Sequence, residues 1–264
     1  MKRALRNRLG DLLLEAFDDP EKRQAIIWLA LFCRLAAERE YPEVPLPELL
    51  EEGREAFPGA GGTSEGVLAH VIGPEKLLRL RRGDTGDVLA AGIPARRDDI
   101  PWVVEPEPDA RAAFPALCER ARMYGDLVVR MEGSDATSHR LDPLRKAMAE
   151  AALCFNAGLF FEAHEHLEHS WMAQPKGPTK RFLQGIIQIS VGFHHARAGN
   201  HDGAVNQLTK GLEKTAGVVG VVLGLDCDSF LPRVAAFREA ILERGRAGMF
   251  PVPLAAIPPM AILE

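Results

Sequence analysis

Residues 151–171 read AALCFNAGLFFEAHEHLEHSW, and residues 192–208 read GFHHARAGNHDGAVNQL. Each stretch has the pattern of a helix, a turn that contains Gly, and a second helix. Small and apolar residues recur at the same relative spacing in both, and this spacing lets paired helices cross closely, as in tetratricopeptide hairpins. The repeated positions are Ala151, Gly158, Ala163 and Leu167 in the first stretch and Gly192, Gly199, Ala204 and Leu208 in the second. The pattern predicts an all-α fold of antiparallel helical hairpins packed as a bundle.

The chain divides into four predicted segments, of which the bundle occupies residues 139–246. We place the main boundary just before it, because residues 132–138 read EGSDATS and are rich in turn-forming types. Residues 1–82 are predicted to be a separate helical region. Residues 83–138 are predicted to be a proline-rich linker followed by one helix. Residues 247–264 form an apolar, proline-rich tail, which we expect to dock on the bundle or on a neighbouring subunit.

The composition is that of an ordinary globular protein, with 47% hydrophobic and 26% charged residues among 264. The net charge of −5 provides no electrostatic footprint for nucleic acid. The apolar run at residues 25–33 is far shorter than the ~20 residues needed to span a bilayer. The cysteines (Cys33, Cys118, Cys154 and Cys227) follow no disulfide or zinc pattern, so each is interpreted as a small core residue. We expect a cytoplasmic protein that does not bind membranes, and the sequence holds no indication of nucleic-acid binding.

The helix from Phe160 to Trp171 carries the polar groups of most interest. At about 100° per residue, His164 lies near the centre of its apolar face and Glu168 lies on the flank, one turn further on. This i,i+4 pair can chelate one ion from one helix face. The order His-Glu-x-x-His of zinc proteases is absent, because position 168 is Glu. The remaining polar positions are predicted to form a solvated opposite face, and they are Glu162, Glu165, His166 and His169.

The next predicted helix, at about residues 179–197, is apolar around most of its girth. Gln184, Gln188 and His195 form a narrow polar stripe on it, all within about 40° of one another. A short connection makes consecutive helices antiparallel neighbours. We therefore expect His164 and Glu168 to face Gln188 and His195.

The stretches quoted above carry a family resemblance. Residues 155–171, the run RFLQGIIQ at 181–188, and the later His194-His195, Gly199-Asn200 and Gly203-Ala204 pairs resemble the signature of domain-of-unknown-function family 309. The resemblance covers about residues 141–245, so the N-terminal half lies outside it. It implies a small all-helical bundle, and the family has no established activity to carry over.

Three interpretations of the polar cluster remain open. His164, Glu168, Gln184 and Gln188 can form a purely structural hydrogen-bonded network, because buried polar groups need partners. The same groups can line a ligand pocket. His164, Glu168 and His195 can also hold a divalent metal as two histidines and one carboxylate.

Two other residues are candidates for binding. The indole N–H of Trp171 can join the network, and Arg181 can reach an anionic ligand or Glu168. For the whole protein we predict a binding or structural module that engages a partner protein or a second copy of the chain. The alternative is a metal- or His-dependent enzyme such as a hydrolase, with His164 as general base oriented by Glu168.

Overall fold

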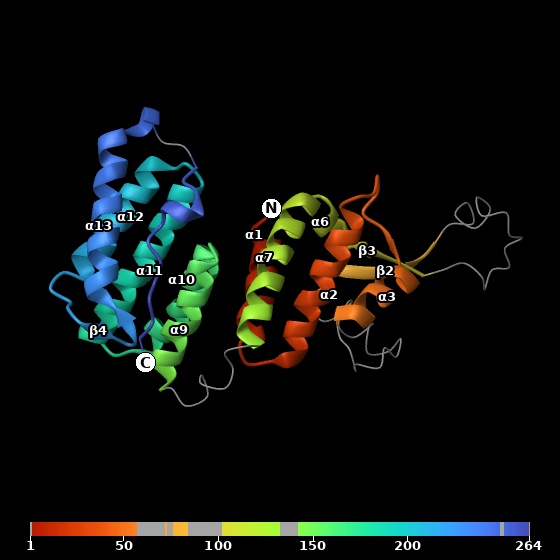
Figure 1. Ribbon diagram of the computed structural model, residues 1–264, viewed down its shortest axis with the longest axis horizontal. Coiled ribbons are helices and arrows are strands. Elements are labelled where there is room, and N and C mark those ends of the chain that lie inside the picture. The colour runs from red at the N-terminus through yellow and green to blue at the C-terminus, as the bar shows by residue number, and fades with distance from the viewer. Residues whose placement is uncertain are drawn as a thin grey trace, which may run out of the picture. The chain divides into compact units, whose positions relative to one another are not determined.

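The computed structural model describes residues 2–56, 72, 76–83, 102–132, 142–248 and 251–263. The chain forms two compact units, Met1–Glu132 and Gly133–Glu264 (Figure 1). This division falls at the start of the 132–138 segment. Each unit has its own core and is described by itself.

The C-terminal unit is a helical bundle, which confirms the predicted all-α fold class. Its helices are α9 (Pro143–Asn156), α10 (Phe160–Ala173), α11 (Pro178–Arg197), α12 (His201–Lys214) and α13 (Cys227–Arg244). Each of these helices packs against the next one in sequence from α9 to α13. Two short strands, β4 (Val221–Val222) and β5 (Leu225–Asp226), form a small hairpin before α13. The short turns η1 (Arg246–Gly248) and η2 (Leu254–Ala256) follow.

The helix boundaries of this unit follow from local chemistry. The side chains of Asp142, Asn200 and Asp226 accept hydrogen bonds from backbone N–H groups in the first turns of α9, α12 and α13. Gly158 and Gly199 end α9 and α11 with φ of 80° and 69°, a left-handed conformation that suits glycine. These two turns occupy matching places in the two stretches quoted first.

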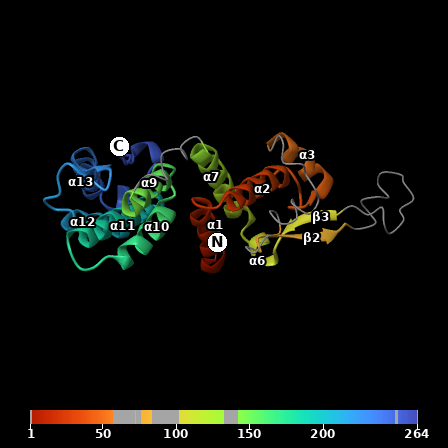
Figure 2. The same cartoon turned by 90° about the horizontal axis from the view of Figure 1, so that it is seen from below.

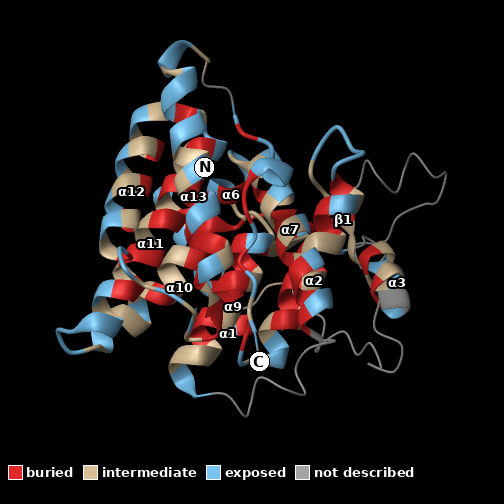
Figure 3. Ribbon diagram, turned by 60° about the vertical axis from the view of Figure 1, so that its left-hand side comes forward, coloured by how far each residue is buried: buried red, intermediate tan, exposed pale blue. Residues whose placement is uncertain are grey.

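The core of the bundle is organised around aromatic rings. Phe155 makes edge-to-face contacts with Phe160, Phe193 and Phe230 at ring-centroid distances of 4.8, 5.4 and 5.7 Å. All four side chains are at most 2% exposed. The burial colouring in Figure 3 shows the corresponding buried faces of α9 to α11. These contacts fix the positions of α9, α10 and α11, on which the candidate site is built.

The proline-rich tail docks on its own bundle. Asn156 exchanges two hydrogen bonds of 2.9 Å with the backbone of Met260. The carbonyl of Val252 accepts from Arg197 at 2.9 Å. Val252, Ile257 and Met260 are each at most 7% exposed. Of the two dockings expected for the tail, the structure therefore shows the one on the same chain.

The N-terminal unit combines helices with a small sheet. Its helices are α1 (Arg3–Ala16), α2 (Pro20–Ala36), α3 (Leu46–Ala56), α6 (Pro108–Arg111) and α7 (Phe114–Glu132). Three antiparallel strands, β1 (Val44–Pro45), β3 (Trp102–Pro106) and β2 (Leu78–Arg82), lie side by side in that order. Figure 2 shows β2 and β3 next to each other near α6.

The sheet corrects one sequence prediction. Residues 83–138 were expected to contain a linker and one helix, but residues 102–106 form the central strand and pair with Leu78–Arg82 across the predicted 82/83 boundary. The prolines of this segment indicated a linker, but a proline is compatible with the end of a strand, and Pro106 is the last residue of β3. Residues 84–101 lie outside the described residues. Among the described residues, no helix has the length and apolar character needed to cross a membrane.

Candidate functional site

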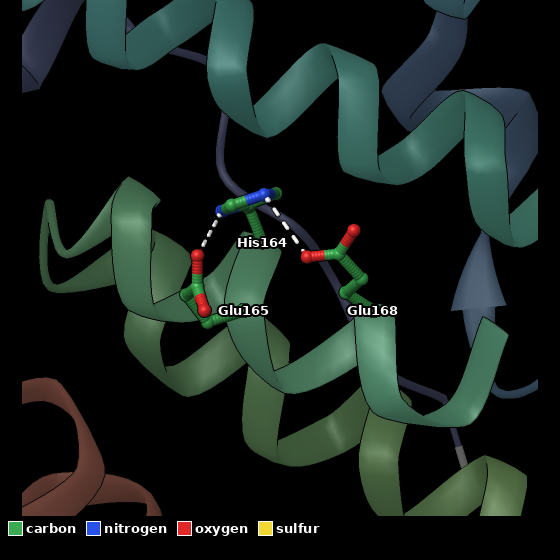
Figure 4. A group of neighbouring side chains, drawn as sticks. All are labelled: His164, Glu165 and Glu168. Carbon is green, nitrogen blue, oxygen red and sulfur yellow. Dashed lines mark ion pairs between the residues drawn. The ribbon is translucent and has the colours of Figure 1, made fainter. Parts of the chain in front are cut away.

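Helix α10 packs on two neighbours, α9 and α11, so it has two protein-facing sides. The side towards α11 carries His164. The ring of Phe161 contacts both His164 and His194 of α11, at centroid distances of 5.5 and 6.3 Å. In Figure 4 the imidazole of His164 lies between the ribbon of α10 and the neighbouring teal helix. The sequence prediction that His164 turns towards the partner helix is therefore in agreement with the geometry.

Two carboxylates flank the His164 ring. Its Nδ1 lies 3.4 Å from Oε1 of Glu165 and its Nε2 lies 3.7 Å from Oε2 of Glu168. Nδ1 also lies 3.2 Å from the carbonyl oxygen of Phe161. The side chains are partly accessible, with 18% of His164, 36% of Glu165 and 40% of Glu168 exposed. One ligand atom from each of the three residues lies within 4.8 Å of the others, which makes them a candidate metal-binding group.

Glu165 is the member of this group that sequence reasoning missed. We expected it on the solvated face, because its wheel angle places it well away from His164. A glutamate side chain is long enough to reach back along its helix, so adjacent residues can meet although their Cβ atoms diverge. The run His164-Glu165 followed by Glu168 is the signal that could have found it.

The predicted ligand His195 lies elsewhere. A Cβ placed on Gly203 would meet the His195 ring at 2.6 Å, so the imidazole packs on α12. Its Nδ1 is 3.3 Å from Nδ2 of Asn200. His195 is therefore outside the group that contains His164 and Glu168. Because Gly203 has no side chain, the His195 ring can pack directly against α12. Helical periodicity alone had placed His195 in one polar stripe with Gln184 and Gln188.

Arg181 also turns towards α12. Its Nε donates to the carbonyl of Lys214 at 3.1 Å and its Nη2 to that of Glu213 at 3.0 Å. These carbonyls end α12, where a cation is favourable. The structure thus gives Arg181 a capping position and brings it to neither Glu168 nor the His164 ring.

Trp171 and Gln188 are half-buried residues of α10 and α11. The ammonium of Lys180 lies 5.0 Å from the centroid of the Trp171 ring, a cation–π contact. Within the described part of the chain, Nε1 of Trp171 and Oε1 of Gln188 are shielded from solvent and have no hydrogen-bond partner. Gln184 is likewise half-buried on α11. Shielded polar atoms that lack a protein partner are places where a ligand or an ordered water can bind.

Part of the predicted solvated face of α10 is not solvated, because it packs against α9. Nε2 of His166 lies 2.8 Å from Oε2 of Glu150, and Nζ of Lys146 lies 3.4 Å from Oε1 of the same carboxylate. Glu162 is 0% exposed. The prediction was wrong for Glu162 and His166 because it assumed one buried face, whereas α10 is covered on two sides. His169 is exposed, as expected.

The Glu150 and Glu162 carboxylates surround Cys154. Complete burial raises the pKa of the Cys154 thiol, and the charges of Glu162 and Glu150 raise it further. This thiol therefore stays protonated. Its environment supports the interpretation of Cys154 as a core residue.

Comparisons with known proteins place the site inside a recognised family region. Residues 148–207 match the family Domain of unknown function (DUF309). The match includes α10 and α11 in full, and it confirms the resemblance drawn from the sequence. His164, Glu165 and Glu168 thus lie within the residues that match this family.

Two uncharacterized proteins are similar to parts of this chain. An uncharacterized protein of Aquifex aeolicus (strain VF5) is 25% identical over 132 residues, which are 48% of this chain and 38% of the relative. The uncharacterized protein YpuF of Bacillus subtilis (strain 168) is 42% identical over 45 residues, which are 17% of this chain and 26% of the relative. The chain therefore spans less than half the length of either relative.

Proposed function

We propose that the region matching DUF309 is a binding module whose site takes a divalent metal ion between α10 and α11. The observation that carries the proposal is the group of His164, Glu165 and Glu168, whose ligand atoms lie within 4.8 Å of one another. One imidazole and two carboxylates suit first-row divalent ions such as Mn²⁺, Fe²⁺ or Zn²⁺. Three protein ligands leave coordination positions open for water or a further ligand.

The surroundings of the group support this assignment. The ligand side chains are partly exposed, so an ion can enter from solvent. Oε1 of Gln188 and the indole N–H of Trp171 are shielded, unpaired polar groups on the same two helices. The proposal gives Oε1 of Gln188 the role of accepting a hydrogen bond from an ion-bound water, and the Trp171 N–H that of donating one to a bound anion. The metal set differs from the one expected from sequence, with Glu165 in place of His195.

Metal titration of the full chain tests the proposal. We expect Zn²⁺ or Co²⁺ to bind near 1:1 in calorimetry and His164→Ala to weaken binding by roughly 100-fold. Glu168→Gln should also weaken it. The matched control is His169→Ala, which removes an exposed histidine from the same helix and should leave affinity unchanged. Equal affinity in wild type and His164→Ala would overturn the assignment.

A His-dependent enzyme is the second candidate, and one observation favours it. A carboxylate lies beside each ring nitrogen of His164, an arrangement that can orient a general base. A screen of ester and phosphoester substrates at neutral pH, without added metal, tests it. Turnover lost in His164→Ala with the helical circular dichroism retained supports catalysis. Turnover that persists in that variant excludes His164 as the base.

A partner protein or a second copy of this chain is the further ligand that the sequence suggested. The tail was one surface proposed for such contacts, and much of its apolar area is covered by the bundle. The polar surface around His164 and Trp171 is therefore the better place to look for a partner. Sedimentation of the full chain with and without Zn²⁺ tests whether metal binding and association are linked.

A further inference from the structure

Helices α2 and α7 of the N-terminal unit approach each other closely. A Cβ built on Gly125 of α7 would lie 3.2 Å from the Cβ of Ala30 on α2. Further along the same pair, the rings of Phe32 and Phe114 meet edge to face at 6.2 Å. Small side chains located between these contacts can reach across the interface.

Cys33 and Cys118 lie beside the Phe32–Phe114 contact. Cys33 directly follows Phe32 on α2, and Cys118 comes one helical turn after Phe114 on α7. Sγ of Cys118 lies 3.9 Å from the carbonyl oxygen of Cys33. A hydrogen bond with the Cys118 thiol raises the pKa of Cys33 far above its ordinary range, and burial raises it further. Cys33 is 3% exposed, whereas Cys118 is only half-buried. Cys118 is therefore the more accessible residue of the pair, and Cys33 belongs to the core.

We propose that Cys118 is oxidised by hydroperoxides and that Cys33 is its resolving partner, so that the N-terminal unit forms a reversible disulfide between α2 and α7. A disulfide requires Cβ atoms about 3.5–4.5 Å apart. The 3.9 Å contact of Cys118 Sγ with the Cys33 carbonyl keeps the two residues next to each other across the helix pair, and rotation about χ1 of each cysteine redirects its Sγ towards the other. This inference is independent of the metal site in the other unit.

The hydroperoxide is the oxidant in this reaction, and it accepts the two electrons that the thiols lose. The Cys118 thiolate attacks one oxygen of the peroxide and the O–O bond breaks, which gives a sulfenic acid. Hydrogen peroxide releases hydroxide, which takes up a proton to become water, and an organic hydroperoxide releases its alcohol in the same way. The Cys33 thiol then transfers its proton to the sulfenic hydroxyl of Cys118 as its Sγ attacks Sγ of Cys118. The S–O bond breaks, an S–S bond forms, and a second water leaves. Two thiols lose two electrons in total, and the peroxide accepts them.

The remaining cysteines provide internal controls. Cys154 and Cys227 lie in the C-terminal unit, and both are at most 1% exposed. Burial raises the pKa of each of these thiols, and neighbouring carboxylates raise it further. Peroxide should therefore leave both unmodified under conditions that oxidise Cys118.

Peptide mapping of the peroxide-treated full chain tests the proposal. We expect an intramolecular Cys33–Cys118 peptide, an intact mass lower by about 2 Da, and recovery of both thiols with dithiothreitol. Cys33→Ser should convert Cys118 to a sulfenic acid that dimedone traps, and Cys118→Ser should leave Cys33 reduced. In the wild type, oxidation of Cys118 without the joined peptide, a disulfide between two chains, or equal oxidation of all four cysteines would overturn it.

Discussion

In the C-terminal unit, the stability of the α9–α10 interface depends on the partners of a buried carboxylate, that of Glu150. The Glu150 carboxylate is 10% exposed and contacts Nε2 of His166 at 2.8 Å and Nζ of Lys146 at 3.4 Å. A buried carboxylate is costly to desolvate unless charged or polar groups replace its water. The His166 imidazole is therefore a stabilising group of the α9–α10 interface.

The His166–Glu150 contact leads to a stability prediction. His166→Ala removes a 2.8 Å hydrogen bond from a carboxylate that is largely inaccessible to water. We expect the free energy of unfolding to fall by about 1–3 kcal/mol, because the remaining Glu150 charge loses a partner. Urea unfolding followed by helical circular dichroism measures this loss. His169→Ala, at an exposed site on the same helix, should change it by no more than about 0.5 kcal/mol.

Glu105 in the N-terminal unit leads to a prediction about pH. It is 2% exposed and contacts Arg79, Arg81 and Arg111 at 2.5, 3.2 and 2.7 Å. Burial alone would raise the pKa of Glu105, but hydrogen bonds from Arg79 and Arg81, with the charges of Arg79 and Arg111, lower it below its ordinary value.

A carboxylate with a lowered folded-state pKa stabilises the fold above its unfolded pKa of about 4.3. That stabilisation disappears as pH falls through the folded value. We expect Glu105→Gln to destabilise the N-terminal unit by roughly 2 kcal/mol at pH 7, a moderate value because the arginines are half-exposed. The difference from wild type should shrink below about pH 4.3. A difference in melting temperature that stays constant from pH 7 to pH 3 would contradict this.

The site shows which residues a single sequence can place. His164 and Glu168 were found because i,i+4 spacing puts both on one helix face, and this depends only on helical geometry. His166 and Glu162 were misplaced because the number of neighbouring helices is a tertiary property. The i,i+4 pairs Lys146 with Glu150 and Glu162 with His166 hold a signal that could have indicated a second polar interface.

At the scale of elements, the α11–α12 pair depends on glycine. A Cβ on Gly211 would lie 2.8 Å from the carbonyl oxygen of Gly185 and 2.7 Å from Cγ1 of Ile189. A Cβ on Gly192 would lie 2.7 Å from the side chain of Leu208. Two helices can approach this closely only where side chains are absent, which supports the role of small residues inferred from the repeat.

This packing predicts the effect of adding a methyl group. Alanine is about 1 kcal/mol better than glycine inside a helix. In Gly211→Ala we expect the clash with backbone to outweigh this gain and to destabilise the unit by about 1–3 kcal/mol. Gly10→Ala is the matched control, because a Cβ at Gly10 of α1 meets nothing within 4 Å. Thermal unfolding of both variants should give opposite signs, and a stabilised Gly211→Ala would contradict the close packing.

The strands of the N-terminal sheet are elements that the hydrophobic pattern of the sequence could not predict. β3 pairs with β2 and β1 across long separations in sequence. Each strand is at most five residues long, and β2 reads LRLRR, which alternates over only four positions. Such runs are too short to separate from loops by pattern, because pairing partners decide their conformation.

At the scale of the whole molecule, each of the two units encloses its own apolar core. In the C-terminal unit the core gathers around Phe155 and is closed by the tail residues Val252, Ile257 and Met260. In the N-terminal unit it gathers around residues such as Phe32 and Tyr124, both 0% exposed. A unit with a complete core can fold without the rest of the chain.

This organisation predicts that residues 142–264 fold alone. We expect the fragment to unfold in one cooperative transition and to bind Zn²⁺ with the affinity of the full chain, since His164, Glu165 and Glu168 all lie within it. A fragment that ends at Gly248 is the matched comparison. It loses the Asn156–Met260 hydrogen bonds and exposes the surface that three buried tail side chains cover. Each such side chain stabilises by about 1.5–3 kcal/mol, so the shorter fragment should melt at a clearly lower temperature. Equal melting temperatures for the two fragments would show that the tail is not part of the folded unit.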